Sequence, residues 1–335
     1  MKTNVLWPSD RSSVVPGYVA ALTVVLVTAA YPALTRLTVT TTLTPADILL
    51  FRLGVSGLLF VPYLILHARE IRRSEWLAAL PLSFLHGWGM AGCVVFGLQY
   101  APASHAAALG PGAIAAWVAV IGFIAYGIAV DTKRLAGIAV IGGGVALILV
   151  ASYRGHSLAG AVIGDAMFLA ASALGATYLV YIQRRRLDPV VAAALVCVAS
   201  AMVVVPWHYF FAASAIASAS RVDLAWQIAF QGVVFGCGVA FAINYAVLAV
   251  GSQTVGLLSA LVPVVGALCA MGIAGDRISD LEWIAIAAIS SGVAVACLPS
   301  HAVPAFAVRR RERRSSLPAA SPAHGSKIAP GMPSR

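Results

Sequence analysis

The sequence LAGIAVIGGGVALILVAS, residues 135–152, decides the fold, because no face of a helix built from it would carry a charge. A helix in the core of a soluble protein keeps one polar face toward water. Residues 189–205 also lack any charged side chain. Since a membrane-spanning helix needs about 20 mostly apolar residues, lipid accounts for both stretches better than a soluble core.

Similar apolar segments lie on both sides of these two. Most gaps between them are short and contain Pro, Gly or a charge cluster, as helix ends require. We therefore predict an all-α membrane protein with ten transmembrane helices at residues 17–39, 46–66, 77–98, 103–127, 135–152, 160–182, 189–211, 224–250, 254–274 and 281–299.

The composition supports a membrane protein. Of the 335 residues, 61% are hydrophobic and 10% are charged, whereas soluble domains carry about 25% charge. So few charges cannot cover a soluble fold, and the apolar content excludes disorder. The five cysteines have no metal-ligand spacing, and we expect no metal or organic cofactor.

The basic residues predict the orientation, because cytoplasmic loops are rich in Lys and Arg. With a cytoplasmic N-terminal segment (1–16), the inner side collects Lys2, Arg11, Arg69, Arg72, Arg73, Lys133, Arg134, Arg184–Arg186, Arg309–Arg311, Arg313, Arg314, Lys327 and Arg335. The outer side collects only Arg36, Arg154, Arg221 and Arg277. We expect a multi-pass protein of the inner membrane with both termini in the cytoplasm.

The two ends of the chain were considered separately. The first apolar stretch is longer than the hydrophobic region of a signal peptide, about 7–15 residues, so we interpret it as a retained helix. Residues 300–335 are rich in Pro, Ser and basic residues. We expect a disordered basic cytoplasmic tail there; contact with anionic lipid is an alternative to a merely solvated tail.

The sequence also contains a weak internal repeat. Residues 97–109 (GLQYAPASHAAAL) resemble residues 247–259 (VLAVGSQTVGLLS), and each segment precedes a helix that contains a proline, Pro111 or Pro263. Five helices per repeat is an odd number, so the second repeat would be inverted relative to the first.

Several short motifs occur in an order typical of one transporter family. They are Pro45 and Arg52 at the opening of the second span, Gly164-Asp165, the Arg184–Arg186 cluster, and residues 261–264 (LVPV) followed by Gly275-Asp276-Arg277. In this order they resemble the EamA-type branch of the drug/metabolite transporter superfamily, over residues 17–299. The resemblance implies two inverted five-helix repeats, at 17–152 and 160–299. It also implies alternating access that moves a small metabolite or drug-like solute, in many members by efflux and with proton exchange.

Polar groups at membrane depth are costly, which makes them functional candidates. Arg52 is a candidate for binding a substrate carboxylate or phosphate; the alternatives are snorkelling and a structural pair with Asp47. His86 is a candidate for both substrate binding and proton coupling; its alternative is a neutral histidine bonded to a neighbouring helix. Asp165 is either a second proton carrier or a first-turn acid that offsets the helix dipole.

The remaining candidates are uncharged and would line a substrate site between the two repeats. They offer hydrogen bonds, ring faces or a freed backbone carbonyl. Helix packing is the alternative for Pro263, and a lipid-facing position is the alternative for Trp88. These predicted substrate-binding residues are Tyr31, Trp88, Tyr178, Asn244, Tyr245 and Pro263.

Other classes of function find little support. The sequence has no HExxH, GxGxxG, GxxxxGK[ST] or GxSxG motif, so we expect no enzyme. The basic residues lie in loops and a tail rather than on a folded surface, so we expect no nucleic-acid partner. The expected partners are a small-molecule substrate and the lipid bilayer, and a homodimer stays open. A non-transporting membrane scaffold or receptor is the alternative function.

Overall fold

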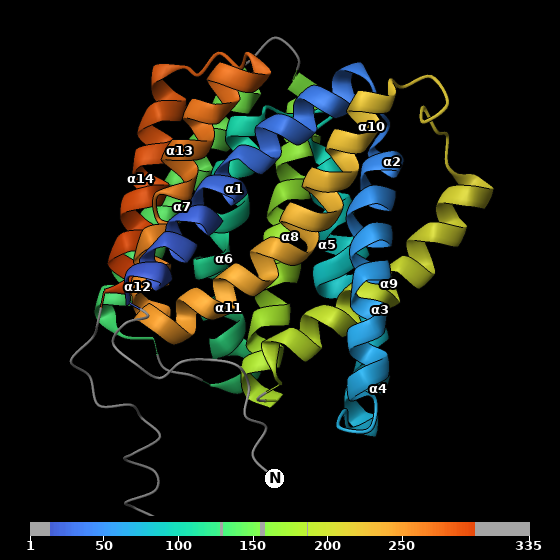
Figure 1. Cartoon of the computed structure of the whole chain (residues 1–335). Coiled ribbons are helices and arrows are strands. Elements are labelled where there is room, and N and C mark those ends of the chain that lie inside the picture. The colour runs from blue at the N-terminus through green and yellow to red at the C-terminus, as the bar shows by residue number, and fades with distance from the viewer. Residues whose placement is uncertain (1–13, 128–129, 155–157, 186, 299–335) are drawn as a thin grey trace, which may run out of the picture. The chain divides into compact units, whose positions relative to one another are not determined.

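The computed structural model describes residues 14–127, 130–154, 158–185 and 187–298, and these ranges contain helices and no strand (Figure 1). Within them, ten helices are long and apolar enough to cross a membrane: Val14–Thr41, Pro45–His67, Arg73–Gly97, Ala103–Tyr126, Thr132–Tyr153, Gly160–Arg185, Pro189–Phe211, Arg221–Val247, Thr254–Ala274 and Asp280–Cys297. The predicted all-α fold with ten spans is confirmed.

The predicted ends of the spans differ from the observed ends by at most four residues. The third span starts at Arg73 rather than at residue 77, because the Glu75 carboxylate accepts a hydrogen bond from the Arg72 N–H, 3.0 Å away, and so caps the helix. Hydropathy does not register such polar caps.

Six spans are single helices. They are the first, α1 (Val14–Thr41); the fourth, α6 (Ala103–Tyr126); the fifth, α7 (Thr132–Arg154); the sixth, α8 (Leu158–Arg185); the seventh, α9 (Pro189–Phe211); and the tenth, α14 (Asp280–Cys297).

The other four spans contain π-helical segments. The second consists of α2 (Pro45–Leu49), η2 (Leu50–Val55) and α3 (Ser56–His67), and the third of α4 (Arg73–Leu82), η3 (Ser83–Gly87) and α5 (Trp88–Gly97). The eighth consists of α10 (Arg221–Gln227), η4 (Ile228–Gly238) and α11 (Val239–Val250). The ninth region consists of α12 (Ser252–Ser259), α13 (Val262–Cys269) and η5 (Ala270–Ala274).

The contacts between the spans of the two halves are symmetric. The first span (α1) packs on α11 and α13 of the eighth and ninth spans, and the sixth (α8) packs on α5 and α6 of the third and fourth. The second span packs on the seventh, and the fifth on the tenth. This pattern is unchanged when each span is exchanged for its counterpart five spans later, as expected for two repeats that fold alike.

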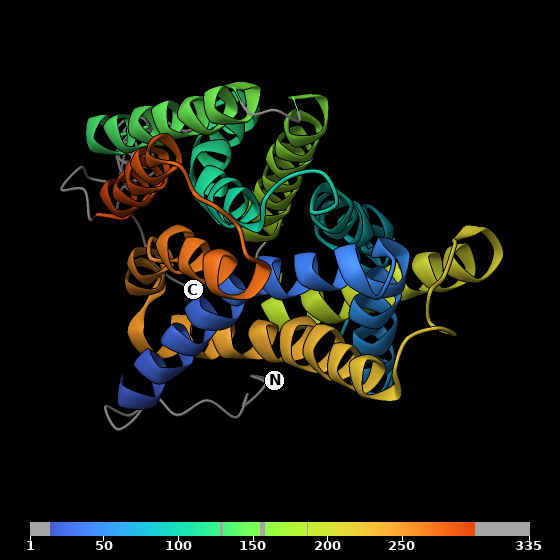
Figure 2. The same cartoon turned by 90° about the horizontal axis from the view of Figure 1, so that it is seen from above.

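The fifth and tenth spans, α7 and α14, lie side by side at one edge of the helical body (Figure 2). Glycines permit their close approach. A Cβ atom at Gly292 would lie 2.8 Å from the Gly137 carbonyl oxygen, and one at Gly144 would lie 2.8 Å from the Ala285 oxygen. Small residues at such crossings let transmembrane backbones pack closely.

Candidate functional site

Arg52 contacts two aromatic rings from other spans. Its Nη1 atom donates a 2.7 Å hydrogen bond to the Tyr31 hydroxyl. Its guanidinium carbon lies 5.0 Å from the centroid of the Tyr31 ring and 4.6 Å from that of Phe235. The two rings stack on each other at 4.0 Å. We call Tyr31, Arg52 and Phe235 the cation–aromatic cluster.

The alternative pairing of Arg52 with Asp47 is wrong. The Asp47 carboxylate instead accepts hydrogen bonds from His208 Nε2 and Ser214 Oγ, both at 2.8 Å, and from the Ala215 N–H at 2.9 Å. Among the residues that the structure describes, no carboxylate lies within 4.0 Å of the Arg52 guanidinium. Its positive charge therefore faces a hydroxyl and two ring faces.

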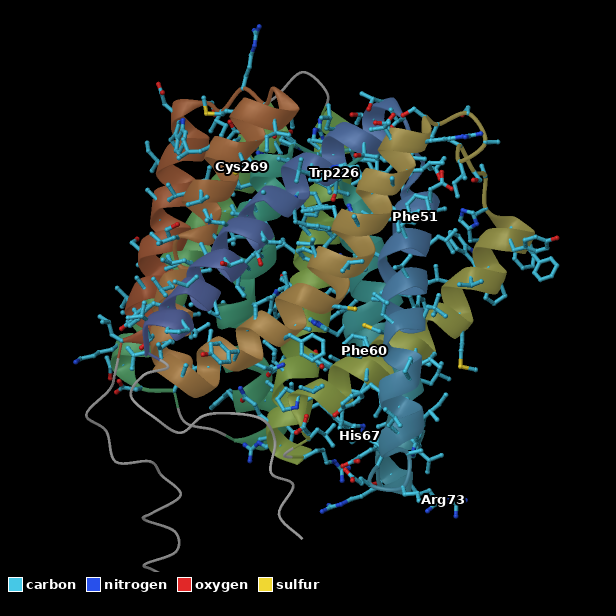
Figure 3. The ribbon with its side chains drawn as sticks, viewed as in Figure 1. Phe51, Phe60, His67, Arg73, Trp226 and Cys269 are labelled. Atoms are coloured by element: carbon cyan, nitrogen blue, oxygen red, sulfur yellow. The ribbon has the colours of Figure 1, made fainter. Side chains whose placement is uncertain are left out.

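Arg52 lies inside the apolar part of its span. It is the eighth of the 23 residues of Pro45–His67, which places it about 10 Å from the helix start at 1.5 Å per residue. Figure 3 shows its neighbour Phe51 toward the upper end, Phe60 midway and His67 at the lower end of that span. A cation at this depth without an acidic partner is suited to bind an anion.

His86 and Tyr178 form a second ring pair. Their rings are nearly parallel, at 7°, with centroids 4.2 Å apart. The Nδ1 atom of His86 and the Nε1 atom of Trp88 are buried and have no hydrogen-bond partner among the described residues. Buried polar atoms usually have a partner, so these two are candidate contacts for a bound solute.

The seventh span joins the two ring pairs, because α9 packs on both η2 and η3. A Cβ atom at Gly87 would lie 1.9 Å from Ser200 Oγ on α9, so the Ser200 side chain packs directly on the backbone of η3 there. The Ser200 hydroxyl is also buried without a partner. The second, third and seventh spans thus converge around Arg52 and His86.

The key side chains of both pairs come from π-helical segments. Arg52 lies on η2, His86 on η3 and Phe235 on η4. A π-helical turn inserts a residue and rotates the side chains that follow it, and such turns are frequent at functional sites.

Three further predicted residues, all on the eighth and ninth spans, lie outside both ring pairs. Asn244 Nδ2 donates to the Ala240 carbonyl of its own helix at 2.7 Å. Tyr245 is partly buried on the same helix, α11. Pro263 is buried at the start of α13, which packs on α1 and α6. For these residues a role in binding remains a prediction.

Asp165 is not a first-turn acid. The helix α8 begins at Leu158, so Asp165 lies in its third turn and is fully buried. Its Oδ1 atom lies 2.9 Å from His105 Nδ1, and its Oδ2 atom accepts a hydrogen bond from Ser152. On the other side of the ring, His105 Nε2 lies 2.7 Å from Glu282 Oε1.

The sequence analysis overlooked this network, which connects α6, α7, α8 and α14. One signal was present: Ser279 and Glu282 have the S-x-x-E spacing of a capping box, which places Glu282 in the first turn of α14. Nothing local marks His105, which stands among alanines. Its partners come from 60 and 177 residues away.

The described residues contain no group of three or more His, Cys, Asp or Glu side chains arranged to hold a metal ion.

Comparison with known proteins finds one matching family model. The model of the EamA-like transporter family matches the chain twice, over residues 15–150 and 162–298. No curated protein matches it. A solved structure described as "Crystal structure of protein" is 20% identical, covers 86% of this chain and 98% of its own, and superposes with a TM-score of 0.56. At that identity the likeness concerns the fold alone.

Proposed function

This chain belongs to the EamA-like transporter family, and on that basis we propose that it exports a small anionic metabolite or drug-like solute across the inner membrane. Ten apolar helices make it a multi-pass membrane protein. The chemistry of the cation–aromatic cluster supports the choice of solute. Efflux, proton exchange and alternating access between the two repeats are what the family resemblance favours.

One observation supports the choice of an anionic solute. Arg52 presents a guanidinium inside the second span, fixed by the Tyr31 hydroxyl and two ring faces, with no described carboxylate within 4.0 Å. A guanidinium binds carboxylate or phosphate through paired hydrogen bonds. We therefore propose that the solute carries one of these groups.

The second ring pair supplies the rest of the proposed site. His86, Trp88 and Ser200 have buried polar atoms without partners, and Tyr178 stacks on His86. These groups can hydrogen-bond the polar part of a solute, while the rings contact its apolar part. His86 is also our proposed proton-coupling group, because an imidazole can bind and release a proton and the buried Nδ1 atom of His86 has no hydrogen-bond partner among the described residues.

The test is transport by the purified protein in liposomes. The panel contains amino acids, nucleobases and phosphate esters, each offered with and without a proton gradient. We expect movement of carboxylate- or phosphate-bearing solutes, loss of that movement in Arg52→Ala and partial retention in Arg52→Lys. Arg221→Ala, which removes an exposed arginine at the start of α10, is the matched control and should transport normally.

The outcomes separate the alternatives. Transport of uncharged solutes alone would overturn the anionic substrate class. No movement of any solute by a protein that is monodisperse and folded would favour the non-transporting scaffold or receptor. A growth-resistance screen of overexpressing cells against the same panel gives the direction of transport.

A further inference from the structure

The strongest polar network outside the proposed substrate site is centred on His105. Its two ring nitrogens lie 2.9 Å from Asp165 Oδ1 and 2.7 Å from Glu282 Oε1. The His105 and Asp165 side chains are 2% and 0% exposed, and that of Glu282 is 12% exposed. We call these three residues the His105 triad.

The triad connects the two repeats at one end of the spans. His105 is the third residue of α6 in the first repeat, and Glu282 is the third residue of α14 in the second. Asp165 on α8 also accepts a hydrogen bond from Ser152, near the end of α7. In the orientation that the basic loops favour, this is the outer end of the protein.

A neighbouring ion pair is already balanced. Arg36 Nε on α1 lies 3.5 Å from Asp276 Oδ1, and Asp276 Oδ2 accepts a hydrogen bond from the Ser104 N–H at 3.1 Å. One positive and one negative charge face each other there. The triad cannot rely on Arg36 to neutralise its own carboxylates.

Among the other helices packed on α6, α7 ends in a charged residue, Arg154, two positions after Ser152 and so at the same end as His105. The described titratable groups of α5 and α13 are the thiols Cys93 and Cys269, and Lys133 and Arg134 lie at the opposite end of α7. On α8, Tyr178, Tyr181, Arg184 and Arg185 are toward the opposite end, and Asp280 is exposed at the start of α14.

Proton counting shows that one carboxylate of the triad is in excess. Ionised carboxylates only accept hydrogen bonds, so contacts from both ring nitrogens require an imidazolium, or a neutral ring and one carboxylic acid. Either form carries one net negative charge. Glu282 is the most exposed member of the triad, at 12% against 2% for His105 and 0% for Asp165, so it is the carboxylate that a proton from water reaches first.

We propose that the His105 triad is a proton-binding site, in which Glu282 takes up a proton from the outer side and thereby releases the outer end of α14 from α6. The proton cancels the charge attraction between Glu282 and the imidazolium, which is strong because the surroundings are apolar. It also weakens the capping of α14, since Glu282 Oε2 accepts from the Ser279 N–H at 2.5 Å and from Ser279 Oγ at 2.8 Å.

A metal ion does not fit the same residues. Each ring nitrogen faces a different carboxylate, so the three side chains point at one another rather than at a common centre. The inference rests on the proposed function in one respect: only in a transporter would the end of the spans that holds the His105 triad act as an outer gate. Its test therefore needs no solute.

The test is hydrogen–deuterium exchange of the full chain in lipid nanodiscs at decreasing pH, with every rate divided by the intrinsic rate at that pH. If opening takes up one proton, the opening constant rises by at most about tenfold per pH unit. We expect protection of peptides 98–106 and 276–285 to fall by up to that factor across a limited pH range. A peptide at the opposite end, residues 130–140, should not change. A wild-type protein whose outer peptides show no pH step would overturn the proposal.

Two variants locate the response. Glu282→Gln cannot take up the proton, and His105→Gln lacks the cation whose attraction the proton cancels, so both should lose the pH step. A step that persists in either folded variant would overturn the proposal. His208→Gln is the matched control, because His208 is another largely buried histidine paired with an aspartate, at 2.8 Å from Asp47. It should keep the step, and its loss there would assign the response to general acid unfolding and overturn the proposal.

The test separates this inference from the proposed function. A pH step in the outer peptides without any solute transport would overturn the function alone. Transport without a step would overturn the triad's role alone.

Discussion

Tyr31 and Phe235 stack with their ring centroids 4.0 Å apart, and this pair has a counterpart elsewhere in the chain. Tyr178 follows Tyr31 by 147 residues, Phe235 follows His86 by 149, and Tyr178 stacks on His86 at 4.2 Å. Each stack therefore joins the first helix of one repeat to the third helix of the other. Arg52 contacts both rings of the Tyr31–Phe235 stack. The surroundings of the two ring stacks therefore differ in charge.

The hydroxyl of Tyr31 fixes the Arg52 guanidinium, and its removal should weaken solute binding. Tyr31→Phe keeps the ring stack and loses the 2.7 Å hydrogen bond. A hydrogen bond to a charged group contributes about 1.5–3 kcal/mol, so KM for an anionic solute should rise about tenfold or more. Proteoliposome transport measures it. Tyr209→Phe, on a side chain that is 81% exposed, should leave KM unchanged, and an equal rise in both variants would contradict the role of Tyr31.

The crossing of α7 and α14 depends on one of two adjacent glycines. A Cβ atom at Gly144 would lie 2.6 Å from Ile289 Cγ1, whereas one at Gly143 meets nothing within 4 Å. Overpacking costs about 1–3 kcal/mol, so Gly144→Ala should lower the unfolding free energy by that amount. Gly143→Ala should be neutral or more stable by up to about 1 kcal/mol, through helix propensity. Unfolding in mixed micelles compares the two, and equal losses would show that the crossing is not closely packed at Gly144.

Asp47 ties the start of the second span to the segment after the seventh. It accepts hydrogen bonds from His208, Ser214 and the Ala215 N–H. A buried donor left without its acceptor costs about 1–3 kcal/mol, so Asp47→Ala, which removes the acceptor of three donors, should lower the thermal midpoint in detergent markedly. Asp223→Ala removes a partly exposed first-turn acid beside its own cap, Ser220, and should cost about 1 kcal/mol or less. A similar midpoint for both variants would show that the Asp47 contacts are not structural.

Hydropathy was enough to predict the spans, because the lipid requirement acts on about 20 successive residues at once. Residues 189–211 and 254–274 were predicted with the bounds that the structure has. The π-helical segments left no such signal: η2 has the sequence LFRLGV, which is as apolar as an α-helix apart from Arg52. Consequently the sequence identified Arg52 and Tyr31 as candidates without showing that they touch.

Long-range contacts were the other part that the sequence did not reveal. Asp165 was interpreted from its neighbours alone, but α8 extends seven residues further toward the N-terminus than Asp165. This extension places Asp165 beside α6 and α7 rather than at a helix end. The role proposed for His105 depends on its contacts with Asp165 and Glu282, which tertiary packing brings to its two ring nitrogens.

The orientation rests on the unequal distribution of basic residues. Basic residues gather in loops and at helix starts on one side, against single arginines on the other; those on the first side are Arg69, Arg72, Arg73, Lys133 and Arg134. We expect reporters fused after Arg335 and within the loop at residues 68–72 to be cytoplasmic, and one inserted at residues 216–219 to be external. An external reporter after Arg335 would contradict both the orientation and the assignment of the His105 triad to the outer end.

His86 can be tested without disturbing its ring contact. His86→Phe keeps an aromatic ring against Tyr178, which now stacks at 4.2 Å, but it cannot bind a proton. If His86 couples solute movement to protons, the variant should still transport down a solute gradient and should lose the acceleration by a pH gradient. The measurement is the initial rate in liposomes with and without that gradient, for the wild type, His86→Phe and His67→Phe. His67 is the control, because it stacks on Tyr63 at 4.3 Å at the end of the second span. A gradient response that survives in His86→Phe would move proton coupling away from His86 and leave the His105 triad as the titratable site to examine.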